Sequence, residues 1–171
     1  YLGSGLEWHD FRLMSETISE LNRLDSGWTL DLYGPIKIKK IITDLKNDNL
    51  HYLGSIRNSD IGEVLSKYSF GIAFYNFSKG SQRNKVGSSM KIIHYLYSGL
   101  IVVSNLINDE KLKNNCFSMM IDTNKLTEKQ IASKIIKSQF QKLDSKSIEH
   151  FINKNYSPFN YYKKVILEFE V

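Results

Sequence analysis

Cysteine is almost absent from this sequence of 171 residues, which contains only Cys116 and four scattered histidines. One cysteine cannot form a disulfide within the chain, and so few Cys and His residues exclude a Cys/His zinc site. No apolar run approaches the roughly 20 residues that span a bilayer, and no signal peptide is recognisable. We therefore expect a cytoplasmic protein without a metal site.

Acidic residues are missing from one long interval. Residues 64 to 108 contain no Asp or Glu, although the chain has 18 of them. The same interval carries Lys67, Lys79, Arg83, Lys85 and Lys91. These five charges equal the net charge of the whole chain, +5, so the remainder is neutral. This concentration disfavours a broad polyanion-binding surface and favours a small anion held at one place.

Several nucleotide and hydrolase motifs are also missing. Gly3-Ser4-Gly5 follows a strand-like segment, but Trp8 stands where the third glycine of a dinucleotide fingerprint belongs. The sequence has no P-loop and no G-x-S-x-G elbow, which excludes P-loop nucleotide hydrolases and esterases of that type. The absence of an Asp-x-Asp pair disfavours a metal-dependent transferase of the single-domain type.

What the sequence does contain is a regular alternation of short strand-like runs and helix-period segments. After a strand end at residues 1–3, strands are expected at 28–33, 50–54, 70–75, 100–103 and 117–121. Helices are expected at 8–24, 36–45, 59–67, 88–98, 127–142 and 157–171. This alternation predicts an α/β fold, with a Rossmann-like, open, mostly parallel sheet of about six strands and helices on both faces.

Capping residues support several of these boundaries. We expect Asp10 to cap the first helix and Ser59 the third. Thr127 and Gln130 have the spacing of a capping box. Gly99 stands where a helix ending in a left-handed glycine would place it.

In such sheets, ligands bind beyond the carboxyl ends of the strands. The helix at 88–98 begins at this edge, after a basic loop with Arg83 and Lys85. Lys91 in its first turn is locally unfavourable, which indicates a negative partner such as phosphate near Ser88 and Ser89. The helical spacing predicts that Lys91 and His94 share one side of this helix. Ile93, Leu96 and Tyr97 are expected on the side toward the sheet. A solvated basic loop without a ligand is the alternative.

Four stretches in order carry a family resemblance: YLGSGLEWHDFRLMSETISEL, WTLDLYGP, NLHYLGSIRNSDIGEVLSKYSFGIAFY and SSMKIIHYLYSGLIVVSN. Together they resemble the C-terminal, donor-binding domain of GT-B glycosyltransferases of the group 1, family 4-like kind. The last stretch is the most specific, because Lys91, Tyr95 and Gly99 fall where the family pattern P-x-K-x-x-E-Y-x-A-x-G has them. The resemblance extends over nearly the whole chain.

The resemblance implies a sugar nucleotide, based on UDP or GDP, as donor substrate and no separate cofactor. The diphosphate would be held by Gly3, Ser4, Arg83, Lys85, Ser88, Ser89 and Lys91. The ribose would fall to His94, and the base to Gly34, Pro35 and Ile56. No catalytic residue is identified.

The resemblance also implies a division of labour within a longer protein. Residues 1–171 would be one nucleotide-sugar-binding domain, inactive alone, and the acceptor would bind an N-terminal domain of the same chain. A helix at 157–171 could cross back to that domain, and contact with the inner face of a membrane would be made through the part not included here. The whole would be a cytoplasmic bacterial enzyme that transfers a sugar to a cell-surface glycan or a lipid-linked acceptor.

Two departures keep other functions open. His94 replaces the glutamate that binds ribose in the family, and Val86 stands at the position of a second glutamate. A degenerate domain with a structural or assembly role is therefore the main alternative. A nucleic-acid-binding module that stacks bases on Tyr75, Phe77 and Tyr95 is less favoured, because no motif for nucleic acid is present.

Overall fold

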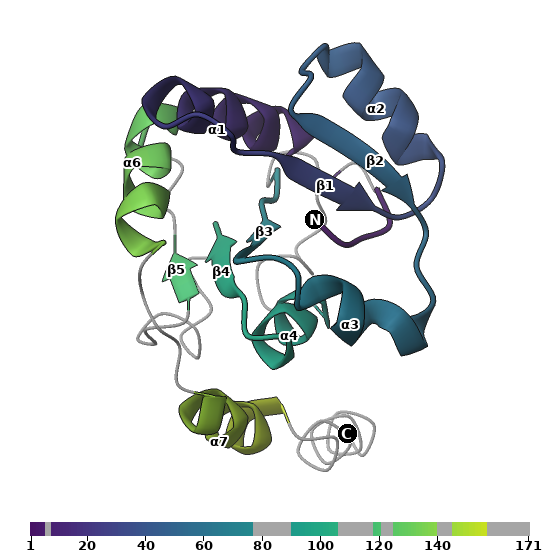
Figure 1. Ribbon diagram of the computed structural model, residues 1–171, viewed down its shortest axis with the longest axis vertical. Coiled ribbons are helices and arrows are strands. Elements are labelled where there is room, and N and C mark those ends of the chain that lie inside the picture. The colour runs from purple at the N-terminus through teal and green to yellow at the C-terminus, as the bar shows by residue number, and fades with distance from the viewer. Residues whose placement is uncertain (6–7, 77–89, 106–117, 121–124, 140–144, 157–171) are drawn as a thin grey trace, which may run out of the picture.

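The computed structural model describes residues 1–5, 8–76, 90–105, 118–120, 125–139 and 145–156 (Figure 1). Within these residues, five strands form two parallel sheets. One sheet pairs β1 (Leu30–Tyr33) with β2 (Leu50–Gly54), and the other has the order β3 (Phe70–Ala73), β4 (Ile101–Ser104), β5 (Ser118–Met120). A parallel bridge between Leu2 and Tyr33 adds the first residues of the chain to the free edge of β1. The expected alternation and parallel pairing are confirmed, but the described strands form two sheets and not the one sheet of about six strands that the sequence predicts.

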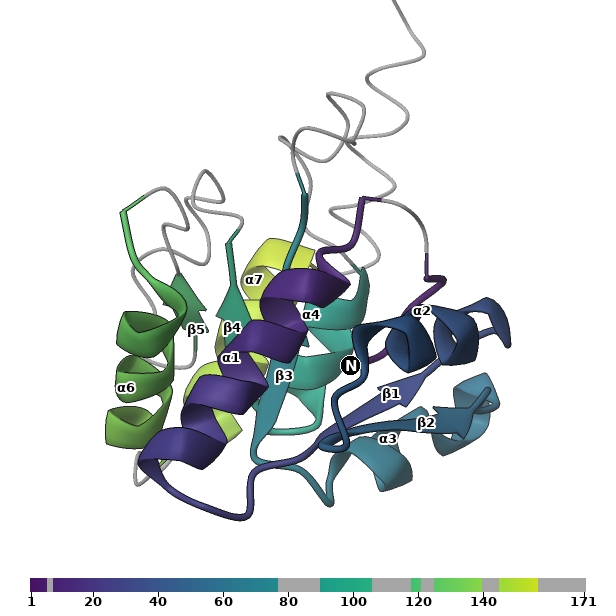
Figure 2. The ribbon, with the colours of Figure 1, turned by 90° about the horizontal axis from the view of Figure 1, so that it is seen from above.

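Helices cover both sides of the strands (Figures 1 and 2). Their bounds are α1 (Phe11–Leu24), α2 (Lys37–Leu45), α3 (Ile61–Leu65), α4 (Met90–Tyr97), α6 (Glu128–Ser138) and α7 (Ser145–Tyr156), with a 3₁₀ turn at Asn58–Asp60. One apolar cluster joins α1, α2 and α6 to the strands, and a second joins α3, α4 and α7 to them. This two-sided burial explains why all four residues of β4 are buried and why the first three, Ile101, Val102 and Val103, are apolar.

The helix boundaries test the capping predictions. Asp10 accepts a hydrogen bond from the Leu13 N–H at 2.9 Å, and Thr127 and Gln130 form the expected capping box. The prediction for Ser59 is wrong, because its hydroxyl donates to the Asp60 carboxylate inside a 3₁₀ turn that leads into α3. Gly99 ends α4 with φ of 75°, a left-handed conformation that glycine adopts without strain.

Helix α7 was not predicted from the sequence. Ile148 and Ile152 are buried on its inner face, one helical turn apart, and α7 packs against α4. The helix expected at 157–171 lies outside the described residues. Within the described part of the chain, no helix is long and apolar enough to cross a membrane, and no three or more His, Cys, Asp or Glu side chains gather as a metal site would need.

Candidate functional site

The carboxyl ends of the first strand segment, β1 and β3 meet at one edge of the molecule. The Gly3 N–H donates to the Tyr33 carbonyl at 3.1 Å, which fixes Gly3 beside the last residue of β1. Helix α4 brings Lys91 to the same edge. A cation from the first turn of a helix therefore lies next to the loop that follows a strand, the arrangement in which α/β proteins bind ligands.

Lys91 is buried, with 7% of its surface exposed. Its Nζ lies 2.7 Å from His9 Nε2, where a charged ammonium would donate and a neutral imidazole would accept. The same Nζ lies 4.6 Å from the ring centroid of Tyr1 and 5.2 Å from that of Tyr75, within the range of cation–π attraction. None of the ion pairs formed by described residues includes Lys91.

Burial lowers the pKa of Lys91 from 10.5 to about 7, because desolvation penalises the charged ammonium. The N-terminal amine of Tyr1 is affected in the same direction. Its pKa falls to about 5, first through burial and second through repulsion from Lys91. The site therefore holds positive charge at a cost in free energy, and a negative group placed beside Lys91 would offset that cost.

The backbone explains why His9 reaches Lys91. The chain at 8–10 runs beside the end of β3: Asp10 N–H donates to the Phe74 carbonyl at 3.0 Å, and Asn76 N–H donates to the Trp8 carbonyl at 2.8 Å. His9 thereby forms an antiparallel bridge with Tyr75, and its ring centroid lies 5.5 Å from that of Tyr75. His9 is not among the binding residues that the sequence predicts.

Two glycines that the sequence predicts for donor binding, Gly3 and Gly34, are neighbours, and Gly3 also lies next to Lys91. A Cβ added to Gly3 would lie 3.1 Å from Lys91 Nζ, so only a residue without a side chain leaves this approach open. Gly34 has φ of 154°, and a Cβ there would collide with the Gly3 carbonyl oxygen. Gly3, which was predicted for the diphosphate, thus lies next to Gly34, which was predicted for the base.

The other residues that the sequence predicts for donor binding differ in how exposed they are. Ser4 and Pro35 are exposed at the same edge, and Ile56 is half-buried against the apolar cluster of α3 and α4. His94 is half-buried on α4. The predictions for Arg83, Lys85, Ser88 and Ser89 lie outside the described residues.

The predicted facing of α4 is confirmed for Leu96 and wrong for Tyr97, which was expected on the side toward the sheet. Lys91, Ile92, Tyr95 and Leu96 form its buried face, whereas Tyr97 is 58% exposed. Tyr95 reaches inward because its ring packs over the backbone of Gly71, and Lys91 lies one turn before it on the same side. Lys91 therefore faces inward on the buried side of α4, whereas His94 is half-buried.

Comparison with solved structures identifies the fold. A mutant of S. aureus TarM in complex with fondaparinux, α-GlcNAc-glycerol and UDP matches over 100% of the chain, with a TM-score of 0.73 and 16% identity. The GtfA/B complex matches over 91% of the chain with a TM-score of 0.63 and 14% identity. The pneumococcal O-GlcNAc transferase GtfA, in complex with UDP and GlcNAc, matches over 98% with a TM-score of 0.59 and 14% identity.

These neighbours are GT-B glycosyltransferases, and the chain shares their fold. It spans about a third of their length: 35%, 32% and 34%, respectively. No family model matches the sequence, and no curated protein matches it.

Proposed function

We propose that this chain is the donor-binding domain of a glycosyltransferase, and that it holds the diphosphate of a sugar nucleotide at Lys91. The observation that carries the proposal is the buried ammonium of Lys91, which faces a histidine and two tyrosine rings at the ligand-binding edge of the sheet. A lysine in such surroundings lowers stability unless a ligand compensates it.

The chemistry of the site suits a phosphate oxygen. An ammonium is a compact donor of three hydrogen bonds, and its attraction to an anion is stronger where water is excluded. Gly3 has no side chain to block the approach, and the N-terminus of α4 adds a partial positive charge. When the diphosphate binds, it places negative charge beside the buried ammonium of Lys91.

The other donor contacts follow from position. We assign the base to the surface formed by Gly34, Pro35 and Ile56, because Gly34 adjoins Gly3 and Pro35 is exposed beside it. His94 is assigned to the ribose from its place one turn after Lys91. UDP in two of the neighbouring structures supports a uridine nucleotide as the first ligand to test.

Acceptor binding is assigned to another part of the protein. The chain spans about a third of the neighbours, so the proposal includes an N-terminal acceptor domain of the same chain, in a cytoplasmic enzyme of bacterial cell-surface glycan synthesis. Whether the complete protein contacts a membrane depends on that other part.

Thermal unfolding with a ligand series tests the proposal. UDP and GDP should raise the melting temperature more than UMP, and uridine should have no effect, because the diphosphate provides the compensating charge. Lys91→Met should abolish the UDP effect, and Lys134→Met, on the exposed face of α6, should preserve it. If no nucleoside diphosphate stabilises a folded wild-type chain, donor binding is refuted and the degenerate domain remains.

A further inference from the structure

His9 and Lys91 form a buried pair, of which only Lys91 has a role in the proposed function. Both side chains are almost completely buried, with 8% and 7% of their surfaces exposed. Lys91 Nζ lies 2.7 Å from His9 Nε2, which is short enough that a hydrogen bond joins the two nitrogens. The state of the imidazole therefore affects the group that meets the diphosphate.

The short contact limits how many protons the pair holds. An ammonium has three N–H donors and no acceptor, and a protonated imidazole carries a donor on each nitrogen. If both residues were protonated, two hydrogens would meet between Nζ and Nε2, and two positive charges would face each other. The observed contact therefore holds at most one positive charge: an ammonium beside a neutral imidazole, an amine beside an imidazolium, or two neutral bases.

Aromatic rings enclose both members of the pair. The ring centroids of Tyr1 and Tyr75 each lie 5.5 Å from that of His9, and both rings are within cation–π range of Lys91 Nζ. Such rings attract a cation to their faces but carry no negative charge of their own. They allow an ammonium at this place without compensating it fully.

The other titratable groups beside the pair do not set its charge near pH 8. Burial raises the pKa of the Tyr1 and Tyr95 hydroxyls above the usual value, so both keep their protons. The Tyr1 amine has a pKa of about 5 and is uncharged at this pH. The Asp10 carboxylate accepts a backbone N–H in the first turn of α1. Within the described residues, the charge that meets a donor depends on how Lys91 and His9 share their protons.

A diphosphate selects one of these arrangements. At pH 8 no hydrogen remains on the phosphate oxygens of UDP, because the second ionisation of a phosphate has a pKa of about 6. Its diphosphate therefore offers acceptors only, which an ammonium binds and the lone pair of an amine repels. If Nζ donates one hydrogen to His9 Nε2, the other two remain for a ligand that enters past Gly3, where an added Cβ would lie 3.1 Å from Nζ.

We propose that His9 is a positioning residue for the donor diphosphate, and that donor binding takes up a proton at Lys91. His9 stays neutral and accepts one hydrogen of the ammonium, which fixes the direction of the other two. The proton comes from the solvent and forms a new N–H bond on the lone pair of the Lys91 amine. The pair then carries the one positive charge that its contact allows. This role rests on the proposed donor site, to which it adds a second residue and a dependence on pH.

Calorimetric titration with UDP at pH 8 counts the protons. The same titration in HEPES and in Tris, whose ionisation enthalpies differ, gives the number taken up for each UDP bound. We expect at least about 0.5 proton, because Lys91 with a pKa of about 7 in the free chain is mostly an amine at pH 8. For the same reason, UDP should bind about tenfold more weakly at pH 8.5 than at pH 7.

The outcomes separate this role from the proposed function. UDP binding without proton uptake would overturn the role of the pair and leave donor binding intact. Absence of UDP binding to the folded wild-type chain would refute the proposed function, and the role of His9 with it. The proton count uses the wild type alone, so it holds even if a variant fails to fold.

Two substitutions separate positioning from packing. His9→Gln keeps an oxygen that accepts from Lys91, whereas His9→Leu fills the aromatic surroundings without an acceptor. A positioning role predicts that His9→Leu weakens UDP binding at least about tenfold and His9→Gln no more than about threefold. If His9→Leu binds UDP as well as His9→Gln does, His9 only packs among the rings and its role is refuted. His150→Gln, on an exposed part of α7, is the matched control and should leave the affinity and the proton count unchanged.

Discussion

Replacement of Lys91 by methionine should change how the stability of the folded chain depends on pH. Lys91 has a pKa of about 7 in the folded state and 10.5 in the unfolded chain. Between these values the unfolded state binds more protons, so stability rises with pH across this window. Below pH 7, Lys91 is charged in both states and its cost is complete. Above about pH 10.5, the cost disappears.

The size of this effect follows from the two pKa values. The difference between 10.5 and about 7 corresponds to roughly 5 kcal/mol at low pH, about 4 kcal/mol at pH 7 and about 2 kcal/mol at pH 9. The wild type should therefore gain about 2 kcal/mol relative to Lys91→Met between pH 7 and pH 9. At pH 7 the variant also loses the hydrogen bond between Lys91 Nζ and His9 Nε2, at a cost of about 1–3 kcal/mol, so its net gain is about 1–3 kcal/mol.

Urea unfolding of both proteins at pH 7 and pH 9, without nucleotide, measures this difference. Subtraction of the two proteins cancels the groups that do not interact with Lys91. The Tyr1 amine does interact with Lys91, but its pKa of about 5 in the folded chain leaves it almost uncharged at both pH values, so it adds little to the difference. Lys134→Met is the matched control, because an exposed lysine should change stability by no more than about 0.5 kcal/mol at either pH. If the free energies of wild type and Lys91→Met change in parallel between pH 7 and pH 9, then Lys91 is not a desolvated cation and the reasoning fails.

Three further substitutions test the packing that supports the site. Tyr95→Phe should lower stability by about 1–3 kcal/mol in urea unfolding, because the hydroxyl that accepts the Leu2 N–H at 2.8 Å is lost from a buried place, whereas Tyr97→Phe on the exposed side should change it by less than about 0.5 kcal/mol. Gly71→Ala should lower the melting temperature by several degrees, since its Cβ would collide with the Tyr95 ring, while Gly62→Ala, with nothing near its Cβ, should raise it slightly. Thr127→Ala should cost about 0.5–2 kcal/mol by removing the capping box of α6, and a loss of helix stability smaller than about 0.2 kcal/mol would contradict that role.

Much of the fold follows from local sequence signals. The apolar runs at 70–75 and 100–103 correspond to β3 and β4, because a strand covered on both faces needs nearly continuous apolar residues. The predicted strand at 50–54 corresponds to β2, in which His51 and Leu53 are exposed. Helix starts were predictable where a side chain caps them, as at Asp10 and Thr127. Ile148 and Ile152 carried the signal for α7, at the spacing of one helical turn.

The structure of the site depends on contacts that no local pattern contains. Lys91 and His9 are 82 positions apart, and they meet only because the segment at 8–10 pairs with the end of β3. The sequence analysis put Lys91 and His94 on one side of α4 and Ile93, Leu96 and Tyr97 on the other, toward the sheet. The packing of Tyr95 over Gly71 fixes the rotation of this helix and turns Lys91 inward.

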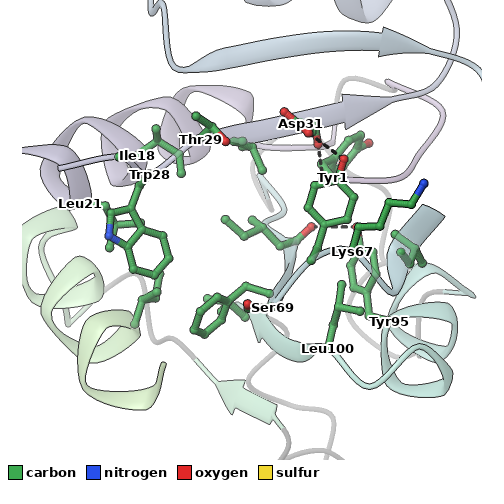
Figure 3. A pocket seen from close by; sticks show the side chains of 18 of the residues that line it. Tyr1, Ile18, Leu21, Trp28, Thr29, Asp31, Lys67, Ser69, Tyr95 and Leu100 are labelled. Atoms are coloured by element: carbon green, nitrogen blue, oxygen red, sulfur yellow. Dashed lines mark hydrogen bonds between the residues drawn. The ribbon is translucent and has the colours of Figure 1, made fainter. Parts of the chain in front are cut away.

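The division into two sheets had no sequence signal at all. An alternation of strands and helices predicts one sheet, and the bridge at Leu2 extends β1 without closing the space to β3. Tyr95 instead spans part of the distance, where its hydroxyl accepts from the Leu2 N–H and donates to the Ile72 carbonyl at 3.3 Å. A cavity of about 270 Å³ between β1 and β3 lies beside this link and is lined in part by Tyr95 (Figure 3).

The pKa of the Lys91 ammonium, measured by NMR of its Cε with and without UDP, tests the central claim most directly. In the free protein the resonance should titrate near pH 7, because the group is buried beside His9 and the rings of Tyr1 and Tyr75. Saturating UDP should raise the pKa to about 9 or higher, since a diphosphate next to the ammonium favours its charged form. A Lys91 pKa that stays the same with bound UDP would contradict the assignment of the diphosphate to this residue.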